Sequence, residues 1–254
     1  MKIADLDKFF HDLDPDLRRR GTCDGLKFGE PGSVVRGVVT AHVPTVQVIR
    51  LAAQLECNTI ITHEPVFYTG DGEAPRDRVS LHKLSLLQEH QLAVYRLHDL
   101  WDTFETHGVL DSWAAQLGLG PAAQASGRYK VYDVPTQSLL EFSRRVKDMM
   151  RLASVRVAGD VQNSVSRVGL GPGEHGHVAD LDASMAMGAN CFVAGESSEW
   201  LAARYAVDAG ISMIVTGHTE SENPGMLNLA KYLKQHFDGL KVEFLDAGNV
   251  YSYL

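Results

Sequence analysis

Residues 34–64, VVRGVVTAHVPTVQVIRLAAQLECNTIITHE, decide the class of fold that this chain can adopt. The β-branched run at 34–41 predicts a strand, and Pro44 follows it at a place where a helix can begin. Residues 45–57 carry apolar side chains at helical spacing, and 58–62 form a second short apolar run. We therefore expect a strand, a helix and a second strand parallel to the first, because strands joined by such a helix form parallel crossovers.

The same alternation continues to the end of the chain. After an amphipathic first helix, further strands are expected at 92–97, 128–134, 154–158, 164–171, 190–195, 212–217 and 241–247, and helices at 78–90, 108–118, 136–150, 178–188, 199–210 and 226–237. This pattern predicts an α/β fold with largely parallel or mixed sheets covered by helices.

A stretch rich in small residues, GLGPAAQASG at 118–127, suggests where the chain divides. We expect two α/β halves in one compact unit without a long insertion. The first half is 1–120 together with the C-terminal segment, and the second half is 125–254. The 254 residues and the hydrophobic content of 44% are ample for a real core.

Composition and charge exclude several classes of function. No apolar run is long enough to span a bilayer, and the first 20 residues lack the features of a signal peptide. We therefore expect a cytoplasmic protein without a membrane role. The net charge is −8, and the basic cluster Arg18–Arg20 is expected to be a solvated helix end. Nucleic acid is excluded as a partner because a phosphate-binding surface needs many clustered cations.

The cysteines predict neither a disulfide framework nor a CxxC zinc site. Cys23, Cys57 and Cys191 are odd in number and widely spaced. We expect all three to be buried as small apolar side chains.

Polar clusters follow three of the expected strands. His63 and Glu64 come after 58–62, HDLWD at 98–102 comes after 92–97, and HTESE at 218–222 comes after 212–217. Ligands collect at the carboxyl ends of strands in open parallel sheets. A mixed imidazole and carboxylate set suits zinc, manganese, iron or cobalt, and it offers more groups than one tetrahedral ion needs. The three clusters together predict two ions bridged by a carboxylate, which would support hydrolytic chemistry.

Each cluster also has a simpler interpretation when it is taken alone. HDLWD can be a turn whose Asp caps the next helix, and HTESE can be an acidic helix start. A zincin motif at His63 is rejected, because Phe67 replaces the second histidine and Pro65 would break the helix. His175 and His177 are expected to be loop residues.

The glycines at 169–173 allow a rival interpretation. They follow a strand and precede a helix, but they fit a dinucleotide-binding loop poorly, because the third glycine is misplaced and no ribose-binding acid follows. A backbone loop near a substrate is the favoured interpretation.

Five blocks give the chain a resemblance to a known family. They are DGLKFG at 24–29, ITHEP at 61–65, LHDLWD at 97–102, GESSE at 195–199 and TGHTESE at 216–222. In these the chain resembles the Nif-three-like family (NGG-one interacting factor three), whose members are also named GTP cyclohydrolase I type 2 homologues. The resemblance implies two related α/β halves facing a shared metal cleft, a pair of divalent metal ions and assembly into a toroidal homohexamer.

Carried over by position, the resemblance implies the metal ligands His63, Glu64, His98, Asp102, His218 and Glu222. Glu64 departs from the family, where a histidine is usual, and shifts the preference toward manganese, iron or magnesium over zinc. His42 stands where the family tends to have aspartate, and it could be an outer-shell group or a substitute ligand. Glu196 and Glu199 resemble cleft residues of the family.

Three functions follow as hypotheses. The first is a dinuclear metal-dependent hydrolase that binds two divalent ions (zinc, manganese or iron), acts on a small nucleotide-like or heterocyclic substrate, and uses Glu196 as the catalytic general base. The alternative is a non-catalytic metal-dependent scaffold, metal-handling protein or regulatory binding protein. The third is phosphate-dependent transfer using the loop 169–173.

Overall fold

The computed structural model describes residues 1–252, apart from the side chains of Arg18 and Arg19, so most of the expected basic cluster lies outside the described residues. The chain forms two compact units: unit 1 is 1–108 with 225–248, and unit 2 is 109–224 with 249–252. The sequence predicted a first half of 1–120 with the C-terminal segment and a second half of 125–254. This division stays a prediction.

Unit 1 is built on a mixed sheet. Within the described residues its strand order is β1 (Gly25–Phe28), β4 (Ala93–Arg96), β3 (Thr59–Thr62), β2 (Val38–Ala41) and β11 (Val242–Phe244). The strands β4, β3, β2 and β11 are parallel, whereas β1 pairs with β4 in the antiparallel sense. The parallel crossover expected within 34–64 is therefore present, with α3 (Val46–Gln54) between β2 and β3. The Thr45 side chain caps α3 by accepting from the Val48 N–H.

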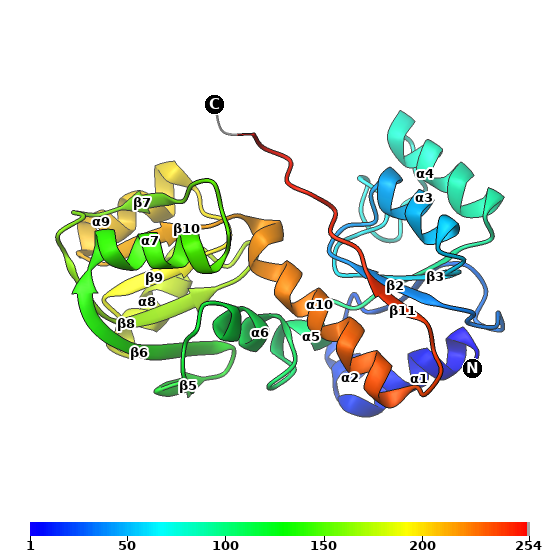
Figure 1. Ribbon diagram of the computed structural model, residues 1–254, viewed down its shortest axis with the longest axis horizontal. Helices are drawn as coiled ribbons and strands as arrows, with labels where there is room; N and C mark the ends of the chain where they lie inside the picture. The colour runs from blue at the N-terminus through cyan, green and yellow to red at the C-terminus, as the bar shows by residue number, and fades with distance from the viewer. Residues whose placement is uncertain (253–254) are drawn as a thin grey trace. The chain divides into compact units, whose positions relative to one another are not determined.

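Helices cover both faces of this sheet. On one face, α3 and α4 (Arg78–Glu89) pack on alternate strand residues such as Val39, Ile60 and Val94. On the other lie α1 (Ile3–Leu13) and the later part of α10 (His218–His236) (Figure 1). Phe10 of α1 contacts the Tyr95 ring. The short helices α2 (Leu17–Arg20) and α5 (Asp99–Thr103) complete the unit.

Unit 2 is built on a second mixed sheet. Its strand order is β5 (Gln124–Ser126), β6 (Tyr129–Ser138), β8 (Ser164–Gly171), β9 (Cys191–Ala194), β10 (Ser212–Val215) and β7 (Arg156–Ala158). The central strands β8, β9 and β10 are parallel. The pairs β5–β6, β6–β8 and β10–β7 are antiparallel.

Alternate residues of β9 show how the sheet of unit 2 is covered. Cys191 and Val193 face a core formed with α6 (Val109–Gln116) and α7 (Leu139–Met149). Phe192 and Ala194 face a core formed with α8 (Val178–Ala186), the π-helix η1 (Glu199–Ala203) and α9 (Arg204–Ala209). A strand buried on both faces is apolar throughout, as its sequence indicates.

The fold class expected from the sequence, α/β with largely parallel or mixed sheets, is confirmed. The main difference is α10, expected at 226–237, which begins at His218 and contains Pro224. Proline in a helix interior removes one backbone hydrogen bond, so the sequence does not predict a helix before residue 226. Among the described residues, no helix is long and apolar enough to cross a membrane. The cytoplasmic location stays a prediction.

Candidate metal centre

Unit 1 brings three histidines to one edge of its sheet. His42, His63 and His98 follow the neighbouring parallel strands β2, β3 and β4. The carboxyl ends of parallel strands meet at the same edge, which explains why residues so far apart in sequence become neighbours. The ring centroids of His42 and His63 are 6.3 Å apart, and those of His63 and His98 are 4.3 Å apart in a stacked arrangement.

His63 is fully buried, and its orientation is set by its two ring nitrogens. Nδ1 lies 3.1 Å from the carbonyl oxygen of Leu97, and Nε2 lies 3.2 Å from Oδ1 of Asp102. A carbonyl can only accept a hydrogen bond, so Nδ1 donates to it, and Nε2 is the nitrogen that faces the carboxylate. A lone pair facing a carboxylate needs either a second proton or a cation at that place.

His98 and Asp102 complete the same group. They are four residues apart at the start of α5, which places both side chains on one face of the helix. His98 Nδ1 lies 3.4 Å from Asp102 Oδ2, and the ligand atoms of His63, His98 and Asp102 lie within 4.8 Å of one another. Nitrogen and oxygen ligands of a tetrahedral ion lie about 3.3 Å apart, given bond lengths of about 2.0–2.2 Å. The group therefore has the spacing of a divalent metal site.

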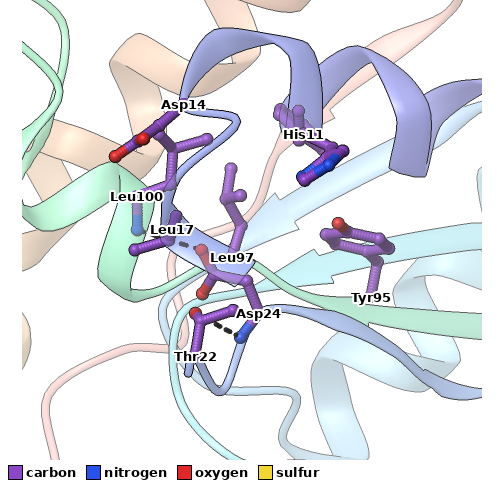
Figure 2. Close-up of a pocket in the computed structure, with 9 residues that line it drawn as sticks. His11, Asp14, Leu17, Thr22, Asp24, Tyr95, Leu97 and Leu100 are labelled. Carbon is purple, nitrogen blue, oxygen red and sulfur yellow. Dashed lines mark hydrogen bonds between the residues drawn. The ribbon is translucent and has the colours of Figure 1, made fainter. Parts of the chain in front are cut away.

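Asp24 fixes the start of α5. Its carboxylate accepts the backbone N–H groups of His98, Asp99 and Leu100 at 2.7, 2.9 and 2.9 Å. These donors have no partner within the helix, so the carboxylate acts as an N-terminal cap. Burial raises the pKa of Asp24, and the three backbone hydrogen bonds oppose this rise. Figure 2 shows Asp24 beside Leu100, with the Thr22 hydroxyl oxygen directed at the Asp24 backbone nitrogen. These three residues line a cavity whose volume is about 20 Å³.

Asp99 and Cys23 lie next to this group. Asp99 Oδ2 accepts from the Thr22 hydroxyl at 2.7 Å and from the Cys23 N–H at 3.0 Å, and Oδ1 lies 2.9 Å from His98 Nδ1. Burial alone would raise the pKa of Asp99, but these hydrogen bonds lower it to about 2. Cys57 and Cys191 are buried as expected, but Cys23 is only partly buried and its Sγ lies 3.5 Å from Asp99 Oδ1. Burial raises the pKa of the Cys23 thiol to about 12.

Glu64 has a cationic neighbour. Its Oε2 lies 3.6 Å from Arg96 Nη2, and Arg96 also binds Asp71 and the His63 carbonyl oxygen. The Glu64 backbone N–H donates to the carbonyl oxygen of His42 at 2.9 Å. Glu64 is thus held at the strand-end edge, and its role as a ligand stays a prediction.

Unit 2 brings a second group to the corresponding edge of its own sheet. Gly173, Glu196 and His218 follow the parallel strands β8, β9 and β10. His218 begins α10, and Glu222 lies one turn further, with Oε2 3.5 Å from His218 Nε2. His218 Nδ1 lies 3.0 Å from Glu196 Oε2. A carboxylate on one ring nitrogen orients the other toward a metal, as in many carboxylate–histidine–metal sites.

Gly173 shows what the glycine-rich loop does. Its φ is +58°, and a Cβ at this position would lie 1.9 Å from Glu222 Oε1 and 3.1 Å from His218 Nε2. Only glycine leaves room for the Glu222 carboxylate there and adopts this backbone at no cost. The loop therefore leaves room for the Glu222 side chain. The Gly173 N–H donates to Ser221 Oγ at 2.9 Å.

The other candidates of unit 2 lie at its surface. Glu199 is exposed, and His177 occupies the N-cap position of α8. His175 lies 2.8 Å from Arg128 Nη1. His175 and His177 therefore lie at a turn and a helix start, as expected for loop residues.

A cavity of about 570 Å³ adjoins the His218 group within unit 2. Its polar lining includes Glu196, Ser197, His218, Thr219, Glu220 and Arg156, together with the Tyr251 ring. Cavities of a few hundred cubic ångströms are typical of small-molecule sites.

The chain is an α/β protein with two mixed sheets. Each sheet has imidazole and carboxylate groups at the carboxyl edge of its parallel strands, and these groups are candidate metal ligands. The family model for Duf34/NIF3 (NGG1p interacting factor 3) matches residues 1–249, and the chain belongs to this family.

Individual relatives are distant but nearly full-length. The chain is 23% identical over 255 residues to a GTP cyclohydrolase 1 type 2 homolog of Clostridium perfringens, covering 96% of this chain and 95% of that protein. A protein of the same name from Clostridium acetobutylicum is 24% identical over 247 residues, covering 92% and 90%. A solved structure from Staphylococcus aureus is similar in fold, with a TM-score of 0.85 and 22% identity over 100% of this chain and 99% of that one.

Cys23 and Asp24 are neighbours of the site that the sequence pattern does not reveal. They precede β1, a short strand that runs antiparallel to β4, so its beginning lies beside the end of β4. The signal for this neighbourhood is the block at 24–29, which carries part of the family resemblance and contains β1.

Proposed function

We propose that this protein is a metal-dependent hydrolase that binds two divalent ions and acts on a small nucleotide-like or heterocyclic substrate. His63, Glu64, His98 and Asp102 of unit 1 and His218 and Glu222 of unit 2 are the proposed ligands. The observation that carries the proposal is the buried His63 ring, whose Nε2 faces the Asp102 carboxylate while Nδ1 is engaged by Leu97.

A divalent ion held by these groups would acidify a bound water and polarise a substrate oxygen. Zinc, manganese and iron all suit a set of imidazoles and carboxylates. The proposed general base is Glu196, whose side chain is 56% exposed and lines the cavity of unit 2. Its contact with His218 Nδ1 supports this role, because the carboxylate can pass a proton while the imidazole stays oriented.

The lining of the cavity supports the proposed class of substrate. The exposed Tyr251 ring offers a face on which a heterocycle can stack, and Arg156 offers a cation for a phosphate. The name GTP cyclohydrolase 1 type 2 homolog, which relatives of this chain carry, agrees with a nucleotide-like substrate.

The proposal is tested by metal content and a broad hydrolase screen on the same preparations. Wild-type protein loaded with manganese, iron or zinc is expected to hold close to two ions per chain and to hydrolyse at least one nucleotide-like compound. The variant His218→Ala is expected to lose that activity. Activity that is unchanged in the variant would show a contaminant and contradict the assignment.

The second candidate is a non-catalytic, metal-dependent scaffold, metal-handling or regulatory protein. Trp200, Leu201 and Val207 are exposed apolar side chains on and next to η1, which favours contact with another protein. A metal-loaded protein that binds its ions and hydrolyses nothing in the screen would favour this function.

A homohexamer is part of the proposal, on the basis of the family resemblance. Light scattering is expected to give six times the chain mass of 27.9 kDa.

A further inference from the structure

Three side chains that the proposed function does not use together form a second group of ligand type in unit 1. Cys23 Sγ lies 3.5 Å from Asp99 Oδ1, and the same oxygen lies 2.9 Å from His98 Nδ1. The ligand atoms of Cys23, His98 and Asp99 all lie within 4.8 Å of one another.

The topology of the sheet creates this group. Gly25 of β1 pairs with Arg96 of β4, so the residues that lead into β1 lie beside the residues that follow β4. The Thr22 hydroxyl and the Cys23 N–H both bind Asp99 Oδ2. Oδ1 is therefore the oxygen that faces the thiol and the imidazole, and two hydrogen bonds to Oδ2 hold the loop.

The distances suit a thiolate-containing site. A sulfur ligand at about 2.3 Å and an oxygen ligand at about 2.0 Å from a tetrahedral ion lie about 3.5 Å apart. The observed separation of Sγ and Oδ1 is 3.5 Å. His98 Nδ1 and Asp99 Oδ1 are at hydrogen-bond distance and need to separate by about 0.4 Å, which one small rotation of either side chain provides.

We propose that Cys23, His98 and Asp99 form a second cation position in unit 1 that takes thiophilic divalent ions such as zinc or cobalt. The ion binds the Cys23 thiolate and the lone pair of His98 Nδ1. The thiol proton is released to solvent, and the proton that His98 Nδ1 donates to Asp99 moves to Nε2 by exchange with solvent. This goes beyond the proposed function, which uses neither Cys23 nor Asp99.

The two positions in unit 1 compete for one atom. His98 Nδ1 faces Asp99 on one side and Asp102 on the other. Because one ring nitrogen has one lone pair, it can bind only one ion at a time. Zinc and cobalt therefore occupy the Cys23 position, whereas manganese, which prefers oxygen and imidazole ligands, occupies the His63 and Asp102 position.

The test is cobalt absorption spectroscopy on the full-length protein. Wild type with cobalt is expected to show an intense near-ultraviolet band from thiolate-to-cobalt charge transfer. Cys23→Ser should lose the band while still binding cobalt, because the ion moves to His63 and Asp102. Asp102→Asn and the control Cys57→Ala should keep it. Bound cobalt without the band, or a band unchanged in Cys23→Ser, would overturn the second position and leave the proposed function standing.

A second measurement on the unmodified protein removes any dependence on the folding of a variant. Cys23 is partly exposed, so its alkylation by iodoacetamide can be followed by mass spectrometry. Zinc is expected to slow the alkylation of Cys23 at least tenfold, and manganese is expected to leave the rate unchanged. Equal rates with and without zinc would contradict the proposal.

Discussion

Asp102 is the residue on which the site of unit 1 depends, since it contacts both His63 and His98. We expect Asp102→Ala to weaken metal binding by unit 1 by more than about 100-fold, because even outer-shell partners of metal ligands contribute about 10–100-fold. Isothermal titration with manganese measures this. The matched control is Glu105→Ala, which removes an exposed carboxylate nearby and should bind as wild type does. Equal affinities of the two variants would remove Asp102 from the ligand set.

Glu196 is expected to act in catalysis without holding the ion. The change Glu196→Gln keeps an oxygen that can accept from His218 Nδ1 but removes the base. We expect kcat to fall by about 10²–10⁴-fold, the usual contribution of a general base, with metal content unchanged. A kcat equal to wild type would leave Glu196 with an orienting role alone.

Lys83 makes the stability of unit 1 depend on pH. It is buried, its Nζ donates to the Val66 carbonyl oxygen at 3.0 Å and lies 4.2 Å from the centre of the Tyr68 ring. Burial lowers the pKa of Lys83 from 10.5 to about 8. Between these two values the unfolded chain holds a proton that the folded chain has lost, so the free energy of unfolding rises with pH.

The comparison with Lys83→Met isolates this effect. The difference in unfolding free energy, wild type minus variant, should increase by about 1–3 kcal/mol as the pH rises through this window. Denaturant unfolding at several pH values measures it, with the exposed Lys231→Met as the control. A difference that is flat with pH would show that burial does not disfavour the Lys83 charge.

At the scale of residues, the sequence is informative where a side chain follows a parallel strand. His63, His98 and His218 are candidates by this rule, because neighbouring parallel strands end at one edge. Cys23 could not be found by this rule, since it reaches the same edge from the start of an antiparallel strand. Nor does the sequence show that Arg96 lies beside Glu64, because that contact depends on the register of β3 and β4.

Among the elements, α5 is held at its first turn by a single side chain. Asp24 accepts three backbone N–H groups there, and α5 carries Asp102. Asp24→Ala leaves these donors without the carboxylate, and we expect a loss of about 1–3 kcal/mol in unfolding free energy. It should also lower the affinity of unit 1 for manganese, because His98 and Asp102 lose their fixed position.

Chemical denaturation and metal titration of this variant measure both effects. Asp14→Ala, which changes another carboxylate of the same cavity, is the control and should keep the metal affinity. A variant that is destabilised but binds manganese as tightly as wild type would show that α5 does not need Asp24 to position its ligands.

The elements that the sequence predicted are those with a long periodic pattern. The helices α3 and α4 and the buried strands β3, β9 and β10 begin and end within three residues of their expected positions. The strands β1 and β5 were not expected, because runs of four and three residues carry too few apolar positions for a pattern. The start of α10 was hidden by Pro224, although it carries His218 and Glu222.

For the molecule as a whole, the family and the fold class could be predicted, and the division into halves stays a prediction. The family match extends over residues 1–249, in agreement with the resemblance carried by the five blocks. Unit 1 takes in 225–248 because β11 pairs with β2, a contact between residues about two hundred positions apart. A local pattern contains no information about such a pairing, and small residues at 118–127 mark a loop as readily as a boundary.

The most direct measurement of the central claim is elemental analysis of the purified full-length protein, followed by anomalous scattering from its crystals. We expect two divalent ions per chain and, in crystals loaded with manganese, anomalous peaks in contact with His63, His98 and Asp102 and with His218 and Glu222. Protein that holds no stoichiometric metal and gains none on incubation with manganese, iron or zinc would contradict it.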